Sequence, residues 1–133
     1  MLTLRSFLSY RTILLASVLC TLASASLTMP SHPTVGISGN PAPGSYVMPQ
    51  GVDLTVTVTA EVGWNANSCA LYKSTTSSSG PFSQVGSYTF SGTHSSDQHT
   101  FSQTLTGTTW YYGWGNSTSG GSASSPVIGY TAL

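Results

Sequence analysis

Short segments that alternate apolar and polar residues, separated by Gly, Ser, Pro and Asn, constrain this chain more than any other feature. In the clearest segment, 52–60, Val and Leu take every second position while Asp and Thr take most of the others. This period of two is typical of a β-strand with one buried face. Turn residues recur about every 8–12 residues, and no window after the N-terminal segment shows helical periodicity. The pattern therefore predicts an all-β sandwich, with a closed barrel as the alternative.

Further strands are expected at 34–38, 68–73, 82–90 and 99–105, and two more in the aromatic stretch 108–130, for about seven in total. The residues expected to face the core are Val52, Leu54, Val56, Val58, Cys69 and Leu71. Trp110, Tyr112 and Trp114 alternate along one strand, so they are expected to share a face. That face either fills the core or binds a ligand, and the apolar row at 52–58 favours the core.

The first 25 residues have the pattern of a cleaved secretory signal peptide. Arg5 and Arg11 precede an apolar run at 13–22, and Ala23-Ser24-Ala25 forms the cleavage site. The run is about ten residues long, shorter than the roughly 20 that a spanning helix needs. Removal of residues 1–25 from 133 leaves 108, enough for one domain.

The expected organisation is therefore a signal peptide at 1–25, an exposed leader at 26–33 and a β-sandwich at 34–133. The expected location is secreted and extracellular, or the periplasm or cell surface if the host is a bacterium.

The mature chain carries few charges. Lys73 stands against Asp53, Glu61 and Asp97, which gives a net charge of −2. Without a basic patch, neither nucleic acid nor an anionic membrane is an expected partner. Once Cys20 is removed, Cys69 has no second cysteine within the chain. It is expected either as a small buried residue or as a thiol that joins two chains, so the protein is a monomer or a Cys69-linked dimer.

Two families of immunoglobulin-like domains share short motifs with this chain. The segments Cys69–Gly86 and Leu105–Gly115 resemble the C to C′ region and the strand-F motif of secreted fibronectin type III domains. Trp110 replaces the corner tyrosine of that motif, and Trp114 replaces its usual valine. The segment 41–55, together with the C-terminal strand, is instead similar to the chitobiase/β-hexosaminidase C-terminal-type domain, but its Tyr-Thr-Asp-Gly motif is missing. Both resemblances imply a single immunoglobulin-like antiparallel β-sandwich.

One cluster has residue types that bind metals: His94, Asp97 and His99. In an extended chain Asp97 and His99 share a face, and His94 could reach them from the loop. A tight transition-metal site uses three or four such ligands, and the alternative is a solvated loop. No cofactor is expected. Separately, Asn116-Ser117-Thr118 matches the acceptor motif for N-glycosylation in a eukaryotic host and lies in an expected surface turn.

The aromatic residues give the main functional hypothesis. Tyr111 lies on the face opposite Trp110, Tyr72 points away from Leu71, and Trp64 is in a loop. These three aromatic residues are expected to form an exposed platform. Aromatic rings stack on the apolar faces of sugars. No nucleophile elbow or phosphate-binding loop is present, so no enzyme is expected. The hypothesis is a secreted, non-catalytic module that binds cell-wall or other polysaccharide. The alternative is an extracellular structural, adhesin or effector-like domain that binds a cell-surface protein.

Overall fold

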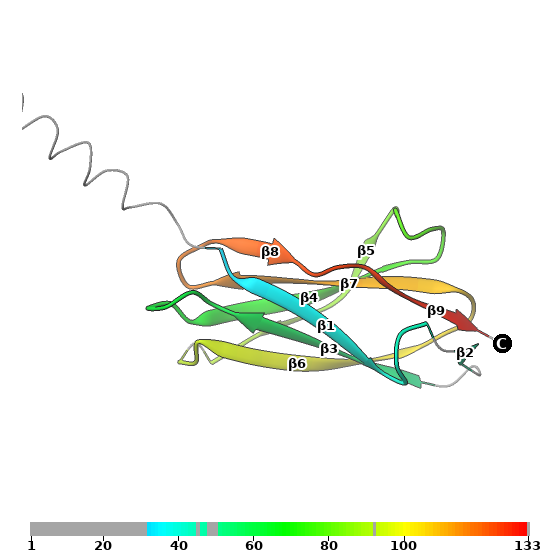
Figure 1. Ribbon diagram of the computed structural model, residues 1–133, viewed down its shortest axis with the longest axis horizontal. Coiled ribbons are helices and arrows are strands. Elements are labelled where there is room, and N and C mark those ends of the chain that lie inside the picture. Colours follow the sequence, from blue (N-terminus) through cyan, green and yellow to red (C-terminus); the bar gives the residue numbers. More distant parts are fainter. Residues whose placement is uncertain (1–31, 45, 48–50, 92, 133) are drawn as a thin grey trace, which may run out of the picture. The chain divides into compact units, whose positions relative to one another are not determined.

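The computed structural model describes residues 32–44, 46–47, 51–91 and 93–132, which form nine strands and no helix (Figure 1). The strands lie in two sheets, so the prediction of an all-β, immunoglobulin-like antiparallel sandwich is confirmed. No helix among these residues is long and apolar enough to cross a membrane. The signal peptide and nearly all of the leader lie outside the described residues and remain predictions.

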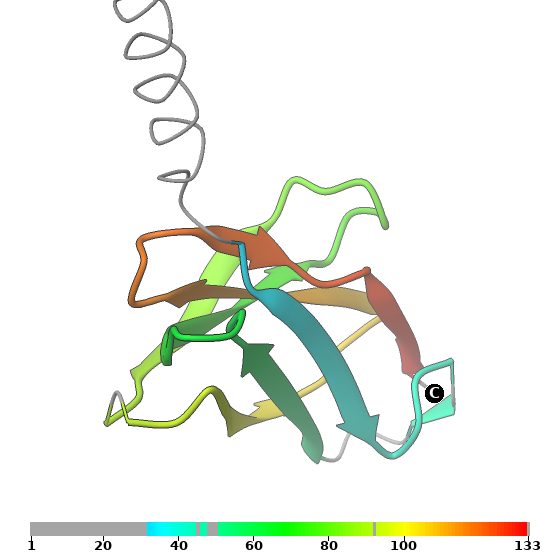
Figure 2. The ribbon, with the colours of Figure 1, turned by 60° about the vertical axis from the view of Figure 1, so that its left-hand side comes forward.

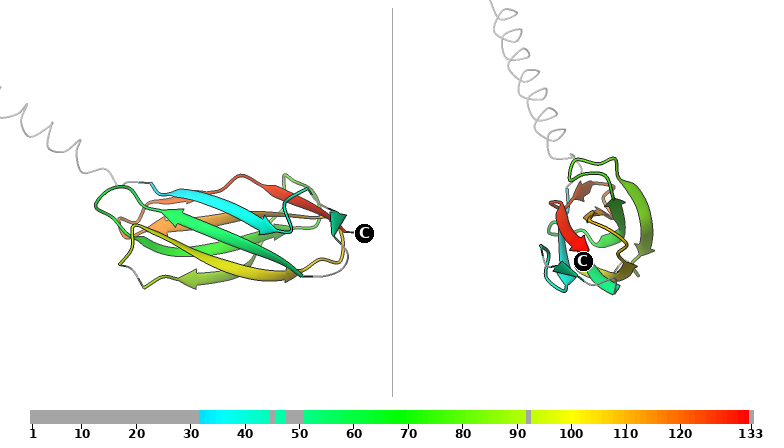
Figure 3. Two further views of the ribbon diagram at one scale, coloured as in Figure 1. Left: turned by 60° about the horizontal axis from the view of Figure 1, so that its bottom comes forward. Right: turned by 90° about the vertical axis from the view of Figure 1, so that its right-hand side faces the viewer.

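The first sheet has three strands in the order β1-β3-β6. They are β1 (Thr34–Asn40), β3 (Gly51–Thr59) and β6 (Ser96–Thr104), and both pairings are antiparallel. Each strand overlaps one of the segments expected from the sequence, and the bounds differ by a few residues. In the views of Figure 3 this sheet forms one of the two layers of the sandwich.

The second sheet has six strands in the order β2-β9-β7-β4-β5, and β8 also pairs with β7. All its pairings are antiparallel except the short parallel pairing of β2 with β9. Its strands are β2 (Tyr46–Val47), β4 (Ala66–Ser74), β5 (Ser83–Thr89), β7 (Thr109–Ser117), β8 (Ser122–Ser124) and β9 (Ile128–Ala132). Figure 2 shows the chain running from β8 into β9 along the same side of the sheet.

The core lies between the inward rows of the two sheets. All four alternating apolar residues of β3 are completely buried, and so are Cys69 and Leu71 of β4, as expected. Burying a Val or Leu side chain stabilises the fold by about 1.5–3 kcal/mol. The core-facing row of β3 is Val52, Leu54, Val56 and Val58.

Strand β7 presents the opposite face to the one expected. Its inward row contains Tyr111, Gly113 and Gly115, whereas the alternating tryptophans and Tyr112 point outward and are half-buried. The two sheets are close at this point: a Cβ atom on Gly113 would lie 2.7 Å from Cγ1 of Val56. No aromatic side chain could enter that space, so the prediction that Trp110, Tyr112 and Trp114 fill the core is wrong.

A serine joins β8 to β9 without breaking the contact with β7. The backbone of Ser125 donates a hydrogen bond to the carbonyl of Gly113 at 2.8 Å. In return, the Ser125 hydroxyl accepts one from the Gly113 amide at 2.8 Å and donates one to the Pro126 carbonyl at 2.9 Å. These bonds satisfy buried polar groups that would otherwise cost stability. They hold β7 in register with both of its outer neighbours.

Candidate functional site

The most distinctive surface is a group of aromatic side chains on the outward face of the second sheet, the outer aromatic cluster: Tyr72, Phe82, Trp110 and Tyr112. Tyr72 of β4 lies in register with Tyr112 of β7, and their rings stack with centroids 4.9 Å apart and planes 3° from parallel. Phe82 meets Tyr112 edge-on, with centroids 4.9 Å apart and planes at 72°. Such aromatic geometries add about 0.5–1.5 kcal/mol to the burial of area.

Trp110 extends the cluster toward β9. It is in register with Gly129, and a Cβ atom on that glycine would lie 2.9 Å from Cδ1 of the indole. The indole therefore lies against the bare backbone of Gly129. On the other side of the cluster, the Tyr72 hydroxyl donates a hydrogen bond to Oε1 of Gln84 at 3.2 Å. All four cluster residues are half-buried, so part of each ring reaches solvent.

The surface around the cluster is uncharged. The outward rows of β4, β5, β7 and β8 consist of Ser, Thr, Ala, Asn, Gln and aromatic residues, and Lys73 belongs to the inward row because it is in register with Tyr111. Burial, with a smaller contribution from Tyr72, raises the pKa of Tyr112 above its ordinary value, so its hydroxyl stays neutral. A ligand on this face would be recognised through ring surfaces and neutral hydrogen bonds.

The platform expected from Trp64, Tyr72 and Tyr111 does not exist as one surface. Trp64 is 43% exposed in the turn between β3 and β4, and Tyr72 is half-buried on the outward face. Tyr111 is completely buried, so the prediction that it is exposed is wrong. Gly113 and Gly115, which alternate with the aromatic residues of β7, are the sequence feature that indicates which row of this strand faces the closely packed core.

Tyr111 has an unusual environment for a polar group. Its hydroxyl is buried and has no hydrogen-bond partner among the described residues. The ring meets that of Tyr130 edge-on, with centroids 6.4 Å apart. Burial, followed by the neighbouring Tyr130, raises the pKa of Tyr111 to about 12. A solvent-inaccessible phenol of this kind cannot stack on a ligand.

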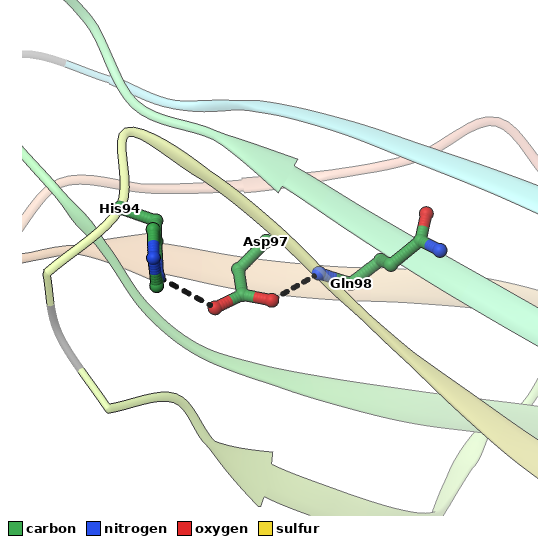
Figure 4. Close-up of polar contacts among 3 residues, drawn as sticks. All are labelled: His94, Asp97 and Gln98. Atoms are coloured by element: carbon green, nitrogen blue, oxygen red, sulfur yellow. Dashed lines mark hydrogen bonds and ion pairs between the residues drawn. The ribbon is translucent and has the colours of Figure 1, made fainter.

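The three candidate metal ligands do not converge. Nδ1 of His94 lies 3.7 Å from Oδ2 of Asp97, whose other oxygen accepts a hydrogen bond from the Gln98 backbone at 2.9 Å (Figure 4). His99 instead stacks on Tyr88, with ring centroids 4.0 Å apart. Among the described residues no group of three His, Cys, Asp or Glu side chains could hold a metal ion.

Cys69 is the remaining reactive residue type. Its side chain is 1% exposed in the inward row of β4. Burial, with a smaller contribution from Asp97, raises the pKa of the Cys69 thiol to about 11. Because the thiolate is the reactive form, a thiol buried in this way is unreactive at neutral pH. This environment is unfavourable for a disulfide between two folded chains.

Comparisons with known proteins identify the fold. No protein-family model matches the sequence, and no curated protein matches it. Among solved structures, superoxide reductase (neelaredoxin) from Ignicoccus hospitalis is similar, with a TM-score of 0.57 and 15% identity over 77% of this chain and 82% of that chain. Two variants of that protein have TM-scores of 0.57 and 0.54 and identities of 16% and 14%. They cover 78% and 84% of this chain and 82% and 87% of theirs. At such identities the similarity establishes an immunoglobulin-like β fold alone.

These structures correct several predictions. They are neither fibronectin type III nor chitobiase-type domains, so the resemblance to those two families is wrong. They are redox enzymes, which contradicts both the prediction that the chain is not an enzyme and the hypothesis of a non-catalytic polysaccharide-binding or adhesion module. The fold they share with this chain is the part of the sequence-based interpretation that is confirmed.

Proposed function

We propose that the outer aromatic cluster is a ligand-binding surface and that it takes an extended, uncharged, proline-rich segment. The observation that carries this proposal is the stacked pair Tyr72 and Tyr112 with Phe82 at its edge, on an uncharged sheet face. The pair is built by strand register, so its geometry is present before any ligand binds. A preformed surface loses little entropy when a ligand is ordered on it.

Chemical matching selects the partner. Proline-rich segments adopt a stiff extended helix and dock on surfaces lined by aromatic rings. Proline rings pack against aromatic faces, and the exposed carbonyls of such a segment accept hydrogen bonds from neutral donors. The cluster supplies the Trp110 indole and the Tyr112 hydroxyl as donors, whereas the Tyr72 hydroxyl already donates to Gln84. No charged residue stands in the outward rows around it, so an acidic or basic peptide would gain nothing from electrostatic attraction.

Superoxide reduction, the activity of the structural neighbours, is not proposed. It requires a one-electron donor, a role that transition metals perform when several His, Cys or carboxylate side chains hold them. The described residues do not fit such a centre, because no three of these side chains come together. His94 and Asp97 form a pair without a third such ligand among the described residues, and their side chains are 63% and 31% exposed.

The proposed partner lies outside the cytoplasm. The N-terminal 25 residues carry the signal-peptide pattern, and the surface of the domain depends on Ser, Thr, Asn and Gln for solubility, with charged residues making up 5% of the chain. Such a protein meets its partner after export, at a cell surface or in the surrounding medium.

A peptide titration tests the proposal. Isotope-labelled protein is titrated with a ten-residue polyproline peptide, with a Gly-Ser peptide of equal length as the control, and amide shifts are followed by NMR. Shifts are expected along β4 and β7, with a Kd of tens to hundreds of micromolar. Tyr112→Ala is expected to weaken binding at least tenfold, as for a central aromatic contact. Trp64→Ala removes an exposed aromatic outside the cluster and is the matched control.

Any of three results would overturn the proposal. The first is the absence of any shift with polyproline at millimolar concentration. The second is binding that Tyr112→Ala and Trp64→Ala weaken equally, because the contact would then not depend on the cluster. The third is an equal set of shifts with the Gly-Ser peptide, because the surface would then show no selection for proline.

A further inference from the structure

The amide of Asn116 is oriented by β4. Asn116 lies next to the end of β7 on the outward face, not in the turn where the sequence suggested it. Its Oδ1 accepts hydrogen bonds from Oγ of Ser68 at 2.5 Å and from Nδ2 of Asn67 at 3.3 Å. Because an amide oxygen accepts and an amide nitrogen donates, these bonds turn Oδ1 toward β4 and place Nδ2 on the other side of the amide.

Trp114 lies beside this amide. Residues two apart in a strand share a face and are about 7 Å apart along it. The residues in register with Trp114 are small, Ala70 on β4 and Ser124 on β8, so no large side chain flanks the indole on either neighbouring strand. Trp114 is half-buried, so part of its indole reaches solvent on the face that it shares with Asn116.

The sequence around Asn116 has the pattern of an N-glycan acceptor, Asn116-Ser117-Thr118. In the folded domain Oγ1 of Thr118 already accepts a hydrogen bond from the Asn65 backbone at 3.1 Å, and the Thr118 backbone donates one to the Asn65 carbonyl at 2.9 Å. The hydroxyl of the acceptor motif is thus engaged once the turn after β7 forms. Modification must therefore precede folding of this turn.

We propose that Asn116 carries an N-linked glycan in a eukaryotic secretory pathway and that the first sugar of that glycan packs on the Trp114 indole. In the reaction, Nδ2 forms a bond to the anomeric carbon of a lipid-pyrophosphate-linked oligosaccharide. The bond from that carbon to the pyrophosphate oxygen breaks, the lipid pyrophosphate leaves, and the amide loses one proton. The folded domain then presents the apolar face of the sugar to the indole, a favourable contact for an aromatic ring.

This inference depends on entry into the secretory pathway and on Trp114 and Asn116. It does not depend on the outer aromatic cluster, so the two proposals can fail separately. The glycan would lie over the β7–β8 end of the sheet. Tyr72 and Tyr112, farther along the same two strands, would remain free for a partner.

The test is expression of the full chain in a eukaryotic secretory host, followed by intact-mass analysis. We expect an added mass that a glycan-specific amidase removes, leaving aspartate at position 116. Asn116→Gln and Thr118→Ala should both lose the added mass, whereas Asn67→Gln, in the adjacent Asn67-Ser68-Cys69, should keep it. A second version with the host's own signal in place of residues 1–25 ensures that failed export cannot explain a missing glycan. An unmodified chain in that version would overturn the proposal.

The role of Trp114 has its own readout. An endoglycosidase that leaves a single sugar on Asn116 should preserve the Tm of the glycosylated domain, whereas removal of that last sugar should lower Tm by a few degrees. In Trp114→Ala, removing the last sugar should leave Tm unchanged. An equal loss of Tm in both proteins would show that the sugar does not pack on the indole.

Discussion

The close approach of the two sheets at Gly113 makes a quantitative prediction. A Cβ atom at this position would lie 2.7 and 2.9 Å from the two γ-carbons of Val56, well inside the 3.5–4.0 Å at which carbon atoms attract. Val56 is completely buried, so it cannot move aside freely. Overpacking of this kind costs about 1–3 kcal/mol, whereas replacing a strand glycine with alanine returns about 0.5–1 kcal/mol.

Gly113→Ala is therefore expected to lower the free energy of unfolding by about 1 kcal/mol, the difference between the midpoints of these two ranges. Chemical denaturation followed by circular dichroism measures this change directly. A domain of about 100 residues loses roughly 4–8 °C of Tm for each kcal/mol. Gly36→Ala is the matched control because it is also in a strand, and a Cβ there would meet nothing within 4 Å. This control is expected to be as stable as the wild type or slightly more stable.

A double mutant separates overpacking from other causes. Val56→Ala alone removes two buried methyl groups and should cost about 2 kcal/mol. When it is combined with Gly113→Ala, the new methyl group occupies part of the vacated space, so the double mutant should be at least about 1 kcal/mol more stable than additivity predicts. The reasoning would be refuted by additive effects, or by a Gly113→Ala protein as stable as the Gly36→Ala control.

Three further substitutions test the polar groups of the core. Tyr111→Phe removes a buried hydroxyl that lacks a described partner and should raise the free energy of unfolding by about 1 kcal/mol in denaturant titrations; a loss of stability would contradict this. Tyr130→Phe removes a 2.8 Å hydrogen bond to the Pro41 carbonyl and should lower it by about 1 kcal/mol in the same assay. Burial raises the pKa of Cys69 from 9.0 to about 11. As pH rises, the unfolded chain therefore loses its thiol proton before the folded chain does, and the stability that this group contributes is lost between these two pKa values. In Cys69→Ala the fall of unfolding free energy between pH 9 and 11 should be shallower, by up to about 1.4 kcal/mol per pH unit; an unchanged slope would contradict it.

Alternation and turn residues were sufficient to predict the sheets. The segment at 52–60 became β3 with Val52, Leu54, Val56 and Val58 inward, because a one-sided strand must turn its apolar row to the core. The expected strands at 34–38 and 68–73 lie within β1 and β4, and the one at 99–105 overlaps β6 except for its last residue. Pairing order and the approach of the sheets depend on contacts between distant residues, which local patterns do not contain.

The sequence pattern predicts the wrong inward face for β7, because hydrophobicity alone does not account for the volume of the side chains. The segment from Trp110 to Gly115 alternates two tryptophans and a tyrosine with another tyrosine and two glycines, and the row with the tryptophans is the more apolar one. The inward row is nevertheless that of Gly113 and Gly115, because both lie against valines of β3 that leave no room for larger side chains. Close packing of the interior therefore decided the orientation of this strand.

The reversed orientation of β7 also exchanges which of its tyrosines is exposed and which is buried. Tyr72 was expected on the outer face and lies there, but its stacking partner Tyr112 was assigned to the core and Tyr111 to the surface. The separation of His99 from His94 was likewise inaccessible to sequence reasoning. Tyr88 of β5 stacks on the His99 imidazole, and this contact joins strands of two different sheets, which local sequence patterns do not contain.

The position of β7 explains how its outward aromatics can be both structural and available. The strand lies inside its sheet, with β4 on one side and β8 and β9 on the other, so each outward side chain has cross-strand neighbours. Tyr112 is covered on one side by Tyr72, and Trp110 lies against Gly129, and both rings remain half-buried. Cross-strand pairs of this kind contribute about 0.2–1 kcal/mol, less than a buried aromatic residue contributes. These rings therefore contribute only part of the stability that buried aromatic residues would contribute. Their packing on neighbouring strands already orders them, so a partner can bind to this surface at a small entropic cost.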